Sequence, residues 1–350
     1  MTKPSTSIKK VLNTNSAIDL LKFIFSIFVA ALHSGLDLGF LNPLYRLAVP
    51  FFFLSSSYFL FSKISGKSTE TERRTVLFQF VLRNVKLYAF WFLLWLPYLM
   101  TSRTDWFESH FLINVLKFLR SLLWGSTFTA SWYIVATVID CSLVYFLSQK
   151  FSTKKLFVFG FLTYMVCLAY SNYYGITRCI PYQGYLFTAF ITVFNSVVNG
   201  FPAGIFWVIA GKFFAENQFK TKLHHYVILI LGFCLLLVEN QIVLKMDWVL
   251  VNDCFIMLIP VCCALFQIAR NAKWSWEPSV RYRNMSTIIY ASHGGILGTL
   301  TAFAIAHLNE PVQNIGLVKF LITSVACILL STLLFQLQKR KRFSWVRYSH

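Results

Sequence analysis

Four polar side chains in the first long apolar segment have the types and spacing of a buried chemical site. They are Asp19, Lys22, Ser26 and His33, at offsets of 0, 3, 7 and 14 residues from the first. At about 100° per residue, these offsets confine them to one narrow sector of a helix. Ionisable groups inside a membrane cost about 2.5 to 3.5 kcal/mol on insertion scales, so each is a functional candidate. The sequence therefore predicts a polar stripe along one helix face.

Histidine is the residue in this stripe best suited to proton transfer, because its ordinary pKa lies nearest neutrality. We therefore predict His33 as a catalytic base, with Lys22 about 16 Å away along the same face. The alternative is structural. In that case Asp19 pairs with Lys22 at the helix start, and His33 is an interior histidine with satisfied hydrogen bonds.

A second apolar segment, 285–305, repeats this pattern. Ser286, Tyr290 and His293 lie at offsets of 0, 4 and 7 residues, which places them on one helix face. Two inward histidines on different helices make a buried polar site a stronger hypothesis than either alone. We predict His293 as a second catalytic residue and Ser286 as a supporting one; packing against the first segment is the alternative for His293.

The elements that carry these residues are predicted to span a membrane. The chain has 350 residues, of which 57% are hydrophobic and only 13% charged, whereas soluble domains have about 25% charged residues. Apolar runs of about 18 or more residues are long enough to cross the bilayer. The predicted fold class is all-α, a polytopic integral membrane protein with about ten transmembrane helices. The predicted spans are 17–35, 44–62, 86–101, 130–149, 156–173, 200–215, 225–242, 248–269, 285–305 and 315–336.

Two further segments do not read as spans. Residues 111–124 carry Lys117 and Arg120 among apolar residues, which indicates an amphipathic helix at the outer interface. Residues 185–199 suggest another interfacial helix. The whole chain is predicted to be a single transmembrane domain (1–350) without a soluble domain, with cytosolic tails at about 1–16 and 337–350.

The formal charge of +19 would suggest a nucleic-acid partner in a soluble protein. Here the basic residues cluster in alternate connections, which is the positive-inside pattern of membrane proteins. The predicted partner is therefore the lipid bilayer and not nucleic acid, with both termini in the cytosol. Seven of the eight cysteines lie in apolar stretches without a Cys-x-x-Cys pair, so no metal site or disulfide framework is expected.

Five segments together carry a family resemblance. They are AIDLLKFIFSIFVAALHS (17–34), VPFFFLSSSYFLF (49–61), RNVKLYAFW (83–91), SWYIVATVI (131–139) and IIYASHGGIL (288–297). In this order they resemble the acyltransferase-3 family of membrane O-acyltransferases, which modify bacterial surface glycans. That family typically has Arg, ten residues, then His in its first span, and this chain has Lys22, ten residues, then His33. Ser57 stands where the family usually has Gly.

The resemblance implies an O-acetyltransferase in the bacterial cytoplasmic membrane. It would move an acyl group, most simply acetyl, from cytosolic acetyl-CoA to a hydroxyl of a surface glycan or its lipid-linked precursor, with no permanently bound cofactor. It implies His33 as the essential residue, Lys22 in place of the family arginine, and Arg83 with Lys86 as the family's basic pair. Asp19, Ser26 and Ser57 are predicted as supporting residues.

Transfer needs a base for the hydroxyl proton and cations for the donor's phosphates. Lys22, Arg83 and Lys86 are the donor candidates, with plain positive-inside charge as the alternative for the last two. Four aromatic residues are candidates for the acceptor or pantetheine path: Trp132, Tyr133, Tyr58 and Tyr290. The alternative is that they are belt residues at the membrane interfaces. The rival function is a small-solute transporter using the same buried stripe.

Overall fold

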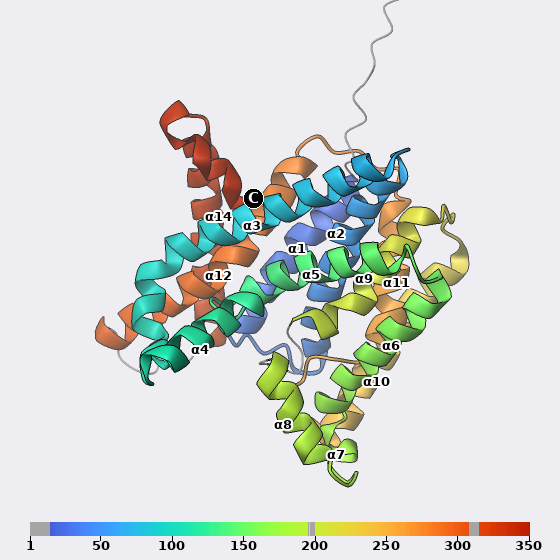
Figure 1. Ribbon diagram of the computed structural model, residues 1–350, viewed down its shortest axis with the longest axis horizontal. Coiled ribbons are helices and arrows are strands. Elements are labelled where there is room, and N and C mark those ends of the chain that lie inside the picture. Colours follow the sequence, from blue (N-terminus) through green and yellow to red (C-terminus); the bar gives the residue numbers. More distant parts are fainter. Residues whose placement is uncertain (1–14, 195, 197–199, 308–314) are drawn as a thin grey trace, which may run out of the picture.

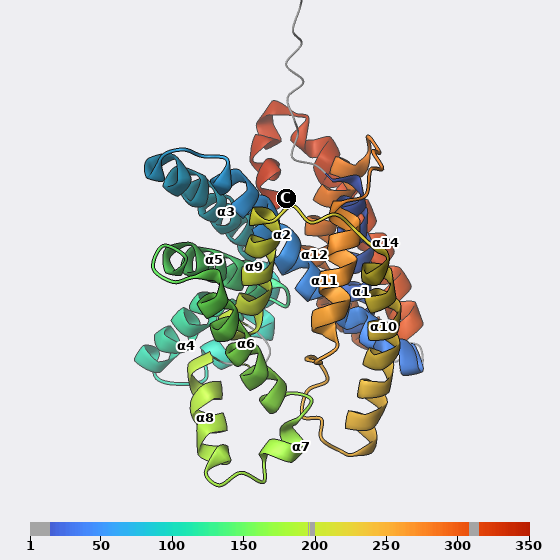
Figure 2. The ribbon, with the colours of Figure 1, turned by 90° about the vertical axis from the view of Figure 1, so that its right-hand side faces the viewer.

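The computed structural model describes residues 15–194, 196, 200–307 and 315–350, and in this part every regular element is a helix. In chain order the elements are α1 (Ser16–His33), η1 (Gly39–Leu47), α2 (Ala48–Ser65), α3 (Glu70–Ser102), η2 (Thr104–Trp106), α4 (Phe111–Leu123), α5 (Ser131–Leu147), α6 (Thr153–Tyr170), α7 (Tyr174–Thr177), α8 (Gln183–Phe194), α9 (Phe201–Glu216), α10 (Leu223–Lys245), α11 (Leu258–Arg270), α12 (Ser279–His307), α14 (Gly316–Gln338) and η3 (Lys341–Ser349). Figures 1 and 2 show them as one bundle, with α7 and α8 at its lower end and the C-terminus in its upper half.

The prediction of an all-helical, multi-pass membrane protein is confirmed. Every predicted span overlaps a helix. Six helical stretches in the described part are long and apolar enough to cross a membrane: Ser16–His33, Gly39–Ser65, Glu70–Ser102, Thr153–Tyr170, Leu223–Lys245 and Gly316–Gln338. The total of ten spans and the cytosolic assignment of the termini stay predictions.

The helix that contains the predicted span 86–101 is much longer than that span. It begins at Glu70, because Thr69 and Glu72 form a reciprocal capping box that satisfies the first free N–H groups. Arg83, which precedes the predicted span, and Lys86, at its predicted start, both lie inside α3.

The predicted span 248–269 is helical only from Leu258 onward. The preceding residues take another conformation because side chains satisfy their backbone groups. Glu239 accepts hydrogen bonds from the N–H groups of Ile256 and Met257, at 2.7 and 2.9 Å. Asn172 accepts from the N–H of Asp253 at 3.0 Å. Side-chain partners of this kind compete with helical hydrogen bonding.

The two predicted interfacial segments are helices, α4 and α8. On α4, Phe111 and Leu112 are 83% and 68% exposed, which suits contact with lipid. The residues of 185–199 beyond Phe194 lie almost entirely outside the described part.

Of the predicted tails, residues 1–14 lie outside the described part. The other tail folds back on α3, where the Trp91 ring N–H donates to the carbonyl of Ser349 at 3.1 Å.

Helix α9 packs along α2 at the centre of the bundle. Two glycines of α9 permit this close approach. A Cβ at Gly204 would overlap Phe53 and Asp140, and one at Gly211 would overlap Ser57 and the backbone of Leu54. Small residues at such contacts let membrane helices approach closely where no hydrophobic effect drives them together.

Candidate active site

Helices α1 and α12 pack side by side along their lengths, and this contact brings the two predicted polar stripes together. Near one end, the Asp19 carboxylate lies 3.9 Å from the guanidinium of Arg283. Farther along, the rings of His33 and His293 lie 5.0 Å apart, centroid to centroid. Both stripes run in the same order, so the two helices are parallel.

The start of α1 is held by contacts with the segment around α11. The Asn15 side chain caps the helix by accepting from the N–H of Ile18 at 3.0 Å, and its amide donates to the carbonyl of Arg270 at 2.9 Å. Ser16 accepts from the N–H of Trp276 at 2.9 Å. These contacts fix the position of α1 along its own axis, and so which residues of its polar stripe face α12.

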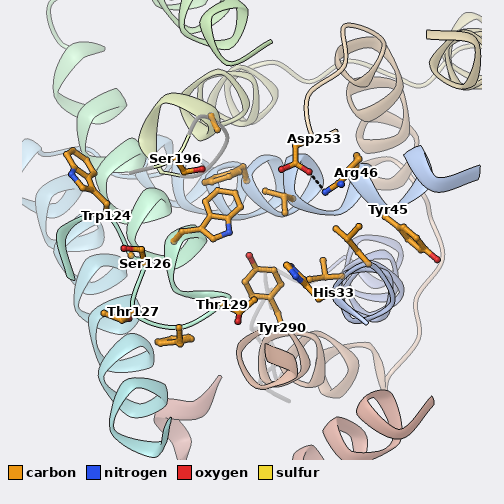
Figure 3. A pocket seen from close by; sticks show the side chains of 18 of the residues that line it. His33, Tyr45, Arg46, Trp124, Ser126, Thr127, Thr129, Ser196, Asp253 and Tyr290 are labelled. Carbon is orange, nitrogen blue, oxygen red and sulfur yellow. Dashed lines mark ion pairs between the residues drawn. The ribbon is translucent and has the colours of Figure 1, made fainter. Parts of the chain in front are cut away.

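His33 is exposed to a cavity of about 580 Å³, within the usual size range of ligand sites. The wall combines aromatic side chains with polar groups from segments far apart in the chain, as Figure 3 shows. Among the lining residues are Arg46, Trp95, Arg103, Trp124, Thr129, Trp132, Trp207, Asp253 and Tyr290. Of the four predicted path aromatics, Trp132 and Tyr290 face this cavity.

His293 is only 1% exposed and lies behind the cavity wall. Its Nδ1 lies 2.6 Å from the carbonyl oxygen of Tyr290. A carbonyl can only accept, so Nδ1 carries the proton and donates. Nε2 of His293 has no hydrogen-bond partner among the described residues. The arrangement fixes the ring beside His33, in a place suited to orienting it.

A second, smaller cavity of about 110 Å³ lies toward the Asp19 end of the stripes. Lys22, Arg83 and Arg283 contribute three cationic side chains to its wall, and Ser286 also lines it. Asp19, beside Arg283, is the carboxylate that faces these three cations, so the wall carries an excess of positive charge, which favours an anionic ligand. This cavity fits the phosphate or carboxylate groups of a donor.

Three aromatic side chains stand where the two cavities adjoin. Tyr290 lines both cavities, and Phe52 and Tyr133 line the smaller one. The Tyr290 ring lies 5.2 Å from that of Tyr133 and 5.5 Å from that of Phe52. The Tyr133 hydroxyl is within 2.9 Å of the Ser56 hydroxyl, which holds it in place. The His33 cavity and the cation-lined cavity are thus separated by a thin aromatic partition.

Several predicted site residues lie elsewhere. Tyr58 packs on Phe266 and borders neither cavity. The Lys86 ammonium lies over the Tyr348 ring at 5.0 Å. The hydroxyls of Ser26 and Ser57 donate to carbonyls of their own helices, so these bonds serve local structure. The ion-pair partner of Asp19 is Arg283 and not Lys22, which was the partner in the structural alternative.

Sequence reasoning did not single out three charged residues of the site: Arg283, Arg46 and Asp253. A signal for Arg283 was present, since it lies 3, 7 and 10 residues before Ser286, Tyr290 and His293 and extends their stripe. Arg46 and Asp253 carried no comparable signal, because they lie in non-α-helical segments that pair only in the folded protein.

The fold and these two cavities define a multi-pass membrane protein with an internal histidine site and an adjoining cation-lined pocket. The sequence model of the acyltransferase-3 family, described as an acyltransferase domain, matches residues 15–336. The chain belongs to this family, as its sequence predicted.

Curated relatives carry different names. The chain is 21% identical over 329 residues to a protein of Enterococcus faecalis named amino-acid racemase, covering 91% of this chain and 45% of that protein. It is 23% identical over 351 residues to the serine/alanine racemase of Enterococcus gallinarum, covering 95% of this chain and 47% of that protein. The chain therefore spans about half the length of these relatives. No solved structure matches it.

Proposed function

We propose that this protein is a membrane O-acyltransferase that moves an acetyl group from cytosolic acetyl-CoA to a sugar hydroxyl. The acceptor would be a cell-surface glycan or its lipid-linked precursor, and the enzyme would work in the bacterial cytoplasmic membrane. Membership of the acyltransferase-3 family supports acyl transfer. The acetyl-CoA donor and the glycan acceptor are what the resemblance to this family implies, and the cation-lined cavity and the His33 cavity support them.

One observation carries this proposal: Tyr290 borders both the His33 cavity and the cation-lined cavity. A donor held by its phosphates at Lys22, Arg83 and Arg283 would have its thioester directed toward the aromatic partition. An acceptor hydroxyl would meet it on the His33 side. The smaller cavity is below the roughly 300 to 1,000 Å³ of ordinary ligand sites, so the proposal requires the partition to move when donor binds.

In the proposed reaction, His33 removes the proton of the acceptor hydroxyl as its oxygen attacks the thioester carbonyl. The C–S bond then breaks, and the proton passes from the imidazolium to the departing thiolate. The products are an acetyl ester and free coenzyme A. His293 would be a positioning residue, because its ring packs beside His33 but is closed off from the cavity.

The direct test is transfer from radiolabelled acetyl-CoA by purified protein in vesicles supplied with a glycan extract. We expect label in alkali-labile esters on the glycan, with free coenzyme A released in equal amount. Release of coenzyme A without labelled ester would indicate hydrolysis only. Absence of both, from protein shown to be folded, would contradict the proposal.

The second candidate is passage of a small solute, and the position of the cavities favours it: they adjoin along a polar stripe that follows most of α1. The relatives' names suggest an amino acid as that solute. Uptake of labelled serine or alanine into the same vesicles would support this candidate. Uptake without acyl transfer would replace the first proposal.

A further inference from the structure

An ion pair between Arg46 and Asp253 forms part of the wall of the His33 cavity. Figure 3 shows the two side chains meeting on the same side of the cavity as His33. Their side chains are 22% and 23% exposed, and both residues line the cavity. The pair is not required by the acyl-transfer step described above.

The hydrogen-bonding capacity of Arg46 is largely unused. A guanidinium has five N–H donors, yet its polar partner in the described part of the chain is Asp253. Arg103, on the same cavity, contrasts with it. Arg103 donates to both carboxylate oxygens of Asp105, at 2.8 and 2.9 Å, and to the carbonyl of Ser126, and its hydrogen bond lowers the pKa of Asp105. The donors of Arg103 are occupied by Asp105 and Ser126, whereas Arg46 retains N–H donors for a ligand.

A buried polar network fixes the Asp253 end of the pair. Asn172 accepts from the backbone N–H groups of Asp253 and Cys254, at 3.0 and 3.1 Å. Its amide donates to Asn252 at 2.8 Å, and Asn252 donates to Asn240 at 3.0 Å. A fully connected network of this kind is rigid. The backbone of Asp253 is therefore held in place before any ligand arrives, and its carboxylate is held by Arg46.

Arg46 also connects the cavity to a second hollow. Together with Tyr45 it lines a space of about 290 Å³ that reaches Asp37, an exposed residue beyond the end of α1. Asp37 is open to water, and hydrogen bonds from Asn42 and the backbone of Gly39 lower its pKa. The pair thus stands where a hydrophilic molecule from that side would pass toward His33.

The charges of the pair cancel, and this restricts the ligand. A carboxylate added to the site would compete with Asp253 for one guanidinium and leave a negative charge uncompensated, which is costly away from water. Uncharged hydroxyl groups avoid this cost. Two neighbouring hydroxyls accept from guanidinium N–H groups and donate to the carboxylate, so both partners of the pair gain hydrogen bonds.

We propose that Arg46 and Asp253 form the acceptor subsite for an uncharged vicinal diol, and that they discriminate against acidic sugars. This rests on the proposed function in so far as the ligand is the sugar acceptor. The neighbouring hydroxyl then lies toward His33, and the aromatic wall around Trp132 packs against the apolar face of the sugar.

Binding is measured without acyl transfer, through the fluorescence of the tryptophans that line the cavity. Methyl glucoside and methyl glucuronide are the probes, because they differ only in a hydroxymethyl group against a carboxylate. We expect the glucoside to bind to the unmodified protein at least tenfold more tightly than the glucuronide. Tighter binding of the glucuronide, or of the zwitterion serine, would overturn the subsite without any variant being made.

Two substitutions then test the pair itself. Asp253→Asn leaves Arg46 unpaired, so the binding preference should reverse in favour of the glucuronide. Loosening of the segment around Asp253 would not by itself produce this reversal. Arg46→Lys keeps the charge but loses the planar fork, and we expect about tenfold weaker glucoside binding with the preference retained. The matched control is Arg74→Lys. Arg74 forms an exposed ion pair with Glu70 at 3.0 Å, outside both cavities. This substitution should change the affinity for neither the glucoside nor the glucuronide.

The outcomes separate this inference from the proposed function. Glucoside binding that depends on the pair, in a protein that transfers no acyl group, supports the subsite and contradicts the function. Acyl transfer with the same acceptor KM in Arg46→Lys, Asp253→Asn and the unmodified protein contradicts the subsite and leaves the function standing.

Discussion

At the scale of single residues, the proposed chemistry depends most on His33. It faces the larger cavity, whereas His293 lies behind the wall. General-base catalysis contributes about 10² to 10⁴ in rate. We therefore expect His33→Ala to reduce acetyl transfer by at least 100-fold, measured with labelled acetyl-CoA, while the protein reaches the membrane in normal amount.

The matched control for this substitution is His224→Ala, on the exposed start of α10 away from both cavities. It should transfer acetyl groups at the unmodified rate. A loss of less than tenfold in His33→Ala, at equal protein level, would remove His33 from the role of base.

Lys22 provides the second prediction at this scale. It shares the smaller cavity with Arg83 and Arg283, while Asp19 is paired with Arg283. If Lys22 binds the donor, Lys22→Ala should raise the KM for acetyl-CoA about tenfold or more and Lys22→Arg should retain most activity, since charge-assisted hydrogen bonds are worth about 1.5 to 3 kcal/mol.

The competing explanation is that Lys22 anchors the helix end by extending its charge toward water. Lys22→Ala would then lower the amount of protein in the membrane, while each folded molecule kept normal kinetics. Steady-state kinetics on purified protein, normalised to folded material, decides between the two.

At the scale of elements, the contact between α2 and α9 depends on glycine. A Cβ at Gly211 would meet the Ser57 side chain and the backbone carbonyl of Leu54, and backbone moves less readily than a side chain. Overpacking of a tight contact costs about 1 to 3 kcal/mol. We expect Gly211→Ala to lower the melting temperature of the detergent-solubilised protein.

Gly184→Ala is the control for that measurement, because a Cβ there meets nothing within 4 Å. Its melting temperature should be close to that of the unmodified protein. Equal stability of the two variants would show that the α2–α9 contact relaxes without cost, and that the close approach has another cause.

At the scale of the whole molecule, the parallel packing of α1 and α12 is consistent with the predicted topology, in which the first and ninth spans cross in the same direction. His350 lines the same cavity as Lys22, so the C-terminal residue lies near the first part of α1.

The topology prediction follows from the clusters of basic residues. Reporter fusions after residues 70, 152, 218, 278 and 345 should all report the cytosol in cells. Two or more fusions that report the opposite side would overturn the ten-span order, and the donor cavity would then need a different source of acyl groups.

The sequence by itself determined the class of fold, the family and the two histidine stripes. Apolar segment length, the distribution of Lys and Arg, and helical periodicity are properties of single segments, so they can be read before any packing is known. The same reasoning missed the real start of α3 and the irregular residues before α11, because capping side chains decided both.

Only the tertiary structure decided which charged groups meet. Asp19 pairs with Arg283 instead of its neighbour Lys22, and Arg46 pairs with Asp253 from a distant part of the chain. It also placed His33 in a cavity, His293 behind its wall and Tyr58 away from both cavities. The physical reason is that such encounters depend on the relative height and rotation of packed helices, which are set by contacts between residues far apart in sequence.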